Sequence, residues 1–186
     1  MSPHTLHERL TFAYVLRATQ YYAAGRHASL AQLSPVNATL LHHAVELFLK
    51  GGLLSFLPLE EIESIRHNLK RLWRTFAEHY QDSTLSEHKS AVGALQKFER
   101  IRYPDAEVLK GMTGQFAILR EEFVTVSKTN SPSLPRFDLV LEDVDHLVLV
   151  ILTIMNANPV AYYQCLSPVA RQSINERNAH PWPTGA

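Results

Sequence analysis

The chain has 186 residues, of which 46% are apolar, and its 18 lysine and arginine residues balance its 18 acidic residues. This length suits one domain, and the apolar content excludes an intrinsically disordered chain. Zero net charge excludes a surface that is basic throughout, although it leaves room for a local basic patch. We therefore expect one domain over residues 1–180, followed by a loose tail over residues 181–186.

Three features of the sequence predict a cytoplasmic protein. Cys165 is the only cysteine, so no disulfide can form within the chain. The first ten residues, MSPHTLHERL, carry His, Glu and Arg where a signal peptide is apolar. The longest strongly apolar run, residues 147–155, is shorter than the roughly 17–25 residues that cross a bilayer, so no membrane segment is expected.

The first predicted helix covers residues 5–24. Thr5 and Glu8 have capping-box spacing at its start, and leucines follow at helical intervals. Gly25 is the predicted stop, because glycine commonly follows the last turn of a helix.

The second predicted helix begins at Ser34, and Pro35 occupies its first turn, where the missing N–H does no harm. Gly51 and Gly52 are expected to weaken or end this helix, and Pro58 marks a new start. Its apolar face is wide and consists of Val36, Leu40, Leu41, Ala44, Val45, Phe48 and Leu49.

A third, basic helix is predicted to carry Arg66, Lys70 and Arg74, which recur every four residues and so form one stripe. A solvated face is the usual role of such a stripe, and phosphate recognition is the alternative. Thr84 and Glu87 repeat the capping-box spacing at the start of a fourth helix, which runs toward Pro104.

The second half of the chain has less regular patterning. Residues 116–126 fit either a helix or an extended pair. A fifth helix from about Asp138 is apolar nearly all round, which predicts a central place in a bundle or one half of a dimer interface. Short helices are predicted to start at Asn158 and Ser167, each followed by proline. The predicted fold class is all-α, an antiparallel up-and-down bundle of four to five helices with short extra C-terminal helices.

Ionisable residues gather on the second helix. His42 or His43 with Glu46 has the spacing of helical metal ligands, and His67 is a third candidate. Di-metal bundle sites use two Glu-x-x-His pairs, whereas this chain shows one pair in the reverse order. We therefore expect no metal, and expect Glu46 to pair with His67 or Lys50.

Other catalytic motifs are missing from the sequence. Cys165 has no histidine near it in the chain, so a small buried hydrophobe is its expected role. The sequence contains no phosphate-binding P-loop, no dinucleotide fingerprint and no nucleophile elbow. No cofactor is predicted.

The segments NATLLHHAVELFLKGGLL, HNLKRLW and FERIRYPD, in this order, resemble the HEPN superfamily over residues 5–104 and 138–163. The resemblance implies an up-and-down bundle, commonly a homodimer, that binds a nucleotide or RNA or partners a nucleotidyltransferase-like protein. Matched by motif, the family's site positions fall on Glu46, Lys50, His67, Arg102 and Tyr103.

Many members of that family are metal-independent ribonucleases with an arginine followed, after four to six residues, by a histidine. Only Arg74 and His79 fit this spacing, on the third helix rather than a late one, and about two such pairs are expected by chance. Our leading hypothesis is therefore a non-enzymatic binding domain, with a toxin-like ribonuclease and a purely structural interaction module, joined through the fifth helix, as alternatives. The predicted ligand-binding residues are Glu46, Lys50, His67, Lys70, Arg102 and Tyr103.

Overall fold

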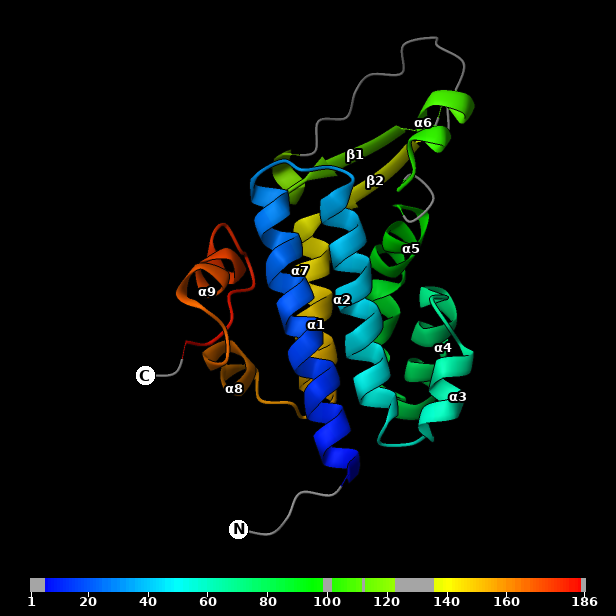
Figure 1. The fold of residues 1–186 in the computed structure, drawn as a ribbon, viewed down its shortest axis with the longest axis vertical. Coiled ribbons are helices and arrows are strands. Elements are labelled where there is room, and N and C mark those ends of the chain that lie inside the picture. The colour runs from blue at the N-terminus through cyan, green and yellow to red at the C-terminus, as the bar shows by residue number, and fades with distance from the viewer. Residues whose placement is uncertain (1–5, 99–101, 112, 123–135, 185–186) are drawn as a thin grey trace.

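The computed structural model describes residues 6–98, 102–111, 113–122 and 136–184. Three long helices lie side by side in the middle of the molecule (Figure 1): α1 (Leu6–Leu30), α2 (Val36–Leu53) and α7 (Leu141–Ile154). Shorter helices flank them: α3 (Leu59–Ser64), α4 (Leu69–Tyr80) and α5 (Lys89–Phe98) on one side, and α8 (Pro159–Gln164) and α9 (Pro168–Asn175) on the other. The described chain is mostly helical, as the sequence predicts.

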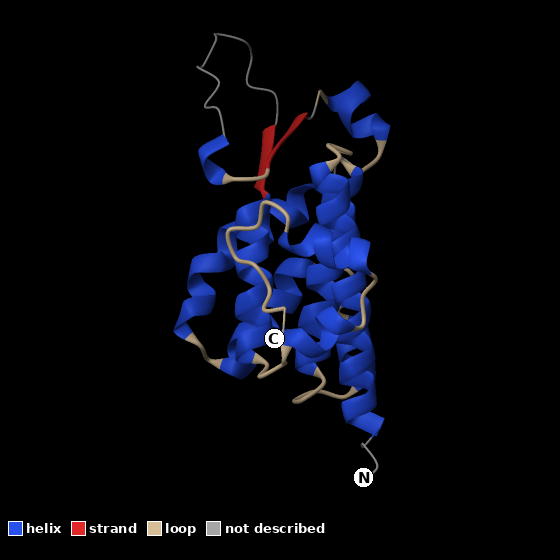
Figure 2. Ribbon diagram, turned by 90° about the vertical axis from the view of Figure 1, so that its left-hand side faces the viewer, coloured by secondary structure: helices blue, strands red, loops and turns tan. Residues whose placement is uncertain are grey.

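A small sheet departs from the all-α prediction. Strands β1 (Thr113–Ala117) and β2 (Arg136–Val140) pair in parallel, and they lie beyond one end of the helices (Figure 2). Helix α6 (Pro104–Lys110) precedes β1, and a 3₁₀ turn, η3 (Arg120–Glu122), follows it. The sequence does not reveal either strand, because TGQFA lacks a clear apolar–polar alternation and the alternation in RFDLV runs directly into the apolar start of α7. Of the predicted segment 116–126, residues 123–126 lie outside the described residues.

Helix α7 contributes to the core. Leu147 and Ile151 have no exposed surface in the single chain, because α7 packs against α2 and α5. These two side chains are therefore not accessible to a second subunit, whereas Leu149, Val150 and Ile154 of the same helix are only partly buried. No helix among the described residues is both long enough and apolar enough to cross a membrane.

Two glycines predicted to end helices instead let helices approach closely. Helix α1 continues past Gly25 to Leu30, and a Cβ at position 25 would lie 2.8 Å from the Leu41 Cδ2 atom of α2. Helix α2 likewise includes Gly52, where a Cβ would lie 2.6 Å from a ring carbon of Phe76. Contacts this short do not occur for real Cβ atoms, so both positions favour glycine because of packing.

The predicted basic helix is interrupted. Arg66 has a left-handed backbone conformation, with φ of 55°, and separates α3 from α4. Asn68 then caps α4 by accepting a hydrogen bond from the Arg71 backbone N–H at 3.0 Å. Arg66 therefore does not share a helical stripe with Lys70 and Arg74, and the three-residue stripe is a wrong prediction.

Capping decides several other boundaries. Asp82, rather than Thr84, caps the 3₁₀ segment η1 (Ser83–His88) that precedes α5. Asn158 and Ser167 cap α8 and α9 with their side chains, so the two short C-terminal helices are confirmed. The Thr5 cap predicted for the first helix lies outside the described residues.

The segment after α9 is docked, contrary to the loose tail that the sequence predicts. Trp182 is 1% exposed, and its ring stacks on Tyr22 of α1 with centroids 5.7 Å apart. The Trp182 backbone N–H donates to the Asn175 side chain at 2.9 Å. Burial of an indole ring explains the docking, which proline-rich composition does not suggest.

Candidate functional site

A buried carboxylate lies at the centre of the candidate site. Glu46 is 2% exposed, and the Lys50 Nζ donates to its Oε1 at 2.8 Å. The Nδ1 of His67 lies 3.1 Å from both oxygens of Glu46, and the Nδ1 of His43 lies 3.6 Å from Oε2. Three of these residues share one face of α2 because they are three or four positions apart, whereas His67 comes from the turn between α3 and α4.

The partners of Glu46 keep it ionised. Burial alone would raise the pKa of Glu46, but hydrogen bonds from Lys50 and His67, together with their positive charges, outweigh it and lower the pKa. The pairing that the sequence predicts for Glu46 is therefore confirmed with both partners. The buried carboxylate therefore has an ammonium and an imidazole as partners within the protein, and these offset the cost of burying its charge.

A cavity of about 430 Å³ opens beside Glu46. The His43 and His67 rings stack at 6.0 Å between centroids, and the Tyr21 ring meets His43 edge-on at 5.1 Å. The cavity thus combines aromatic walls with ionisable groups from α1, α2 and the α3–α4 turn. It is lined by Tyr21, Thr39, Leu40, His42, His43, Glu46, His67 and Arg102.

Arg102 reaches this cavity from the segment just before α6. Its Nη2 donates to the Tyr103 hydroxyl at 3.0 Å, and its guanidinium lies 4.6 Å from the centroid of the Tyr103 ring. Tyr103 itself is 58% exposed. The pair therefore places a fixed positive charge and an accessible aromatic ring together at one edge of the cavity.

The structure brings most of the predicted ligand residues together. Glu46, His67 and Arg102 line one cavity, and Lys50 is bonded to Glu46. Tyr103 joins the group through Arg102. Lys70 is exposed on α4 and is not among the described residues that line the cavity.

The candidate ribonuclease pair is not brought together. Positions five apart on a helix differ in direction by about 140°, so Arg74 and His79 point away from each other. The Arg74 Nε lies 3.8 Å from Glu78 Oε1, and the His79 ring stacks on the Phe56 ring with centroids 5.1 Å apart. Within the described part of the chain, no contact joins the two residues, and their spacing carries no catalytic signal.

A second, larger cavity of about 670 Å³ lies at the start of α1. Its ionisable residues are His7, Glu8 and Arg9, which are consecutive and exposed, and Tyr162, which is buried. Among the described residues that line it, this cavity has no buried carboxylate with converging partners like Glu46. The cavity beside Glu46 is therefore the better candidate.

Comparison of the chain with protein-family models, with curated proteins and with solved structures gives no match in any of the three. The function therefore has to be argued from the site itself.

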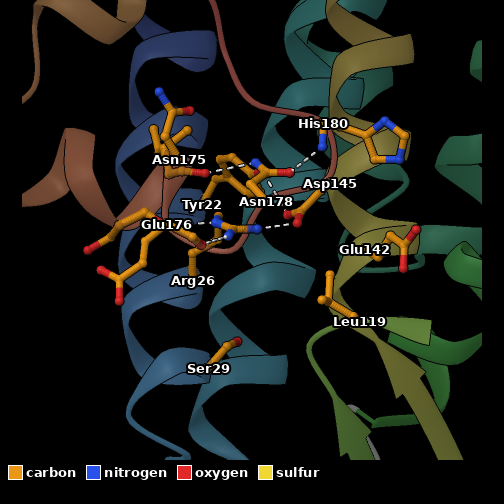
Figure 3. Close-up of polar contacts among 12 residues, drawn as sticks. Tyr22, Arg26, Ser29, Leu119, Glu142, Asp145, Asn175, Glu176, Asn178 and His180 are labelled. Carbon is orange, nitrogen blue, oxygen red and sulfur yellow. Dashed lines mark hydrogen bonds and ion pairs between the residues drawn. The ribbon is translucent and has the colours of Figure 1, made fainter. Parts of the chain in front are cut away.

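Sequence reasoning missed a second buried cluster, which lies between α1, α7 and α9 (Figure 3). Arg26 is fully buried and pairs with Asp145, which also accepts a hydrogen bond from the Tyr22 hydroxyl at 2.7 Å. Arg26 further donates to the backbone oxygens of Ser173 at 2.8 Å and of Glu176 at 2.6 Å. Because every buried charge here has a partner inside the protein, we assign this cluster to stability.

Three histidines form a further cluster next to Asp145. The His146 ring meets His88 edge-on at 4.7 Å and stacks on His180 at 4.5 Å. Burial lowers the pKa of His88, and the nearby His146 and His180 act in the same direction, whereas the carboxylates of Glu87 and Asp143 oppose it. His88 therefore favours the neutral form in the folded protein.

This depressed pKa predicts a loss of stability at mildly acidic pH. Between the ordinary histidine pKa of about 6.5 and the lower folded value, the unfolded chain binds more protons, so the free energy of unfolding falls as pH falls. Urea unfolding at pH 7.5 and pH 5.5 should show this decrease. His88→Gln should lose less stability over this interval, whereas His7→Gln, at an exposed position of α1, should match the wild type. An equal decrease in all three proteins would contradict the role of His88.

Proposed function

We propose that this protein is a non-enzymatic, HEPN-like binding domain, built on an antiparallel up-and-down helical bundle, and that its cavity beside Glu46 takes the phosphate of a nucleotide. The observation that carries the proposal is the wall of the cavity, where Arg102 lies with His43 and His67 around a carboxylate already paired with Lys50. Guanidinium and imidazole groups are the side chains that recognise phosphate oxygens in such positions.

The charges of the site favour an anion. Lys50 and Arg102 each carry one positive charge, so together they exceed the single negative charge of Glu46. Because Lys50 bonds Glu46 at 2.8 Å, the carboxylate charge is compensated within the protein. A phosphate entering the cavity would therefore meet the Arg102 guanidinium while the nearby carboxylate is already paired with Lys50.

The size of the cavity favours a small ligand over a long strand. A volume of about 430 Å³ lies within the usual range for small-molecule pockets, roughly 300–1,000 Å³. Non-specific RNA binding uses extended basic grooves, whereas Arg102 is the one arginine or lysine among the described residues that line this cavity. Stacking of one nucleotide base on the exposed Tyr103 ring, with its phosphate at Arg102, fits these dimensions.

Arg102→Ala should weaken binding of a fluorescent adenine nucleotide by at least about tenfold, because one charge-assisted contact to phosphate contributes roughly 1.5–3 kcal/mol. The measurement is fluorescence anisotropy in EDTA at low salt. Lys70→Ala provides the matched control, since it removes the same charge from an exposed position that does not line the cavity. Its affinity should stay within about twofold of the wild type.

Equal losses in both variants would mean that the nucleotide binds by general charge attraction, and would overturn the proposed cavity. Absence of nucleotide binding by the wild type would overturn the function itself. The same protein should leave labelled single-stranded RNA intact in EDTA. Cleavage that His79→Ala abolishes would instead establish the ribonuclease.

A further inference from the structure

The donor atoms around Glu46 have a second capacity, and we infer that His43, Glu46 and His67 form a binding site for a divalent transition-metal ion such as Zn²⁺. Each residue offers one ligand atom, and the three atoms lie within 4.8 Å of one another. This inference does not depend on the nucleotide site, because it concerns the metal ion alone.

The two separations that involve Glu46 fit a tetrahedral ion. Zinc bonds of about 2.0–2.1 Å place neighbouring ligand atoms about 3.3 Å apart in tetrahedral geometry. The His67 Nδ1 lies 3.1 Å from Glu46 Oε2, and the His43 Nδ1 lies 3.6 Å from the same oxygen. Both imidazoles therefore converge on one carboxylate oxygen with nearly the spacing that the ion needs.

The chemistry of the donors points to a borderline metal rather than to calcium or magnesium. Two imidazoles and one carboxylate suit zinc and neighbouring transition metals, whereas calcium and magnesium prefer ligand sets made of oxygen. Three protein ligands leave a fourth position for water or a ligand. The sequence argument named these residues but expected no metal, because di-metal bundle sites use two Glu-x-x-His pairs and this chain has one pair in the reverse order. A single-ion site needs only the three donors that the fold brings together, with His67 supplied by the α3–α4 turn.

Lys50 supports the carboxylate and also opposes the cation. Its Nζ bonds Glu46 Oε1, the oxygen that His43 does not approach, and so holds the carboxylate in place as outer partners of metal ligands do. The Lys50 ammonium nevertheless lies close to the site and repels a metal ion, as does the guanidinium of Arg102, which lines the same cavity.

The test is isothermal titration calorimetry of the full chain with Zn²⁺ alone, in a non-chelating buffer near pH 7.5. The wild type should bind one ion at this site, and His43→Ala and His67→Ala should each weaken this binding by at least about tenfold. Both side chains are partly or largely exposed, at 43% and 71%, so these replacements leave the core intact. Co²⁺ titration should also give the intense visible absorption of a tetrahedral ion, which both variants should lose.

Two matched controls replace histidines that lie outside the proposed metal site. His79→Ala removes an exposed histidine of α4, and His146→Ala disrupts the other histidine cluster. Both should bind Zn²⁺ like the wild type. Binding that is equally tight in His43→Ala and His67→Ala, or no binding by the wild type, would overturn the metal site, and the nucleotide titration in EDTA would be unaffected by either result.

Discussion

Replacing Arg26 with methionine is expected to lower the free energy of unfolding by about 3–5 kcal/mol, the usual cost of removing one partner from a buried ion pair. Arg26 has no exposed surface, and Asp145 is 1% exposed. Among the described residues, methionine would leave the Asp145 carboxylate with the hydrogen bond from the Tyr22 hydroxyl, and the carbonyls of Ser173 and Glu176 would lose the hydrogen bonds that Arg26 donates. A buried charge without a counter-ion is strongly disfavoured.

Urea unfolding measures this loss, and Arg74→Met is its matched control. This variant makes the same replacement at a side chain that is 71% exposed and lies 3.8 Å from Glu78. The free energy of unfolding should therefore change by no more than about 0.5 kcal/mol. The Arg26→Met loss should also be smaller at pH 5 than at pH 8. Burial raises the pKa of Asp145, and without Arg26 this carboxyl would more readily take up the proton that removes its charge.

The double variant Arg26→Met with Asp145→Leu separates two explanations. If the unpaired carboxylate causes the loss, removing it should recover part of the lost stability. If the double variant is no more stable than Arg26→Met, the stabilisation by Arg26 comes from its bonds to the α9 carbonyls instead. A loss below about 1 kcal/mol in Arg26→Met would contradict the assignment of the cluster to stability.

Local patterns made the helices predictable. The helical spacing of apolar residues predicted α2, and the prolines after Asn158 and Ser167 predicted the starts of α8 and α9. These predictions succeed because periodicity and capping depend only on residues that are close together in the chain. The same local logic placed Glu46 beside Lys50, four positions away on one helix. The contact between Glu46 and His67 was expected because a partly buried carboxylate needs a partner, and in the structure His67 reaches Glu46 from the α3–α4 turn.

Long-range packing set what the sequence could not reveal. Arg26 and Asp145 are 119 positions apart, and neither has a local signature that distinguishes it from a solvated charge. A glycine such as Gly25 or Gly52 can end a helix or can allow two helices to approach closely, and the sequence does not distinguish the two roles. The side chain packed against each glycine in the fold shows that the second role applies here. The fifth helix, predicted to begin at about Asp138, begins instead at Leu141, because residues up to Val140 belong to β2 and pair with β1.

The second large effect concerns Trp182, at the docked C-terminal segment. Trp182→Ala should lower the free energy of unfolding by about 3–5 kcal/mol, the usual cost of truncating a buried aromatic side chain. The indole is 1% exposed and stacks on Tyr22, whose hydroxyl bonds Asp145. Its loss would therefore open a cavity next to the Arg26–Asp145 pair as well as release the segment that holds it.

Tyr103→Ala is the control for this experiment, because it truncates an aromatic side chain that is 58% exposed. Its unfolding free energy in urea should stay within about 0.5 kcal/mol of the wild type. The urea dependence of the Trp182→Ala unfolding free energy should also stay close to that of the wild type if most of the core remains folded. Similar stability of Trp182→Ala and Tyr103→Ala would mean that the indole is not packed against α1, and the loose tail predicted from the sequence would then be the better description. A selective loss in Trp182→Ala would instead make residues 180–184 part of the folded domain, since a segment in solvent cannot stabilise the buried cluster beside it.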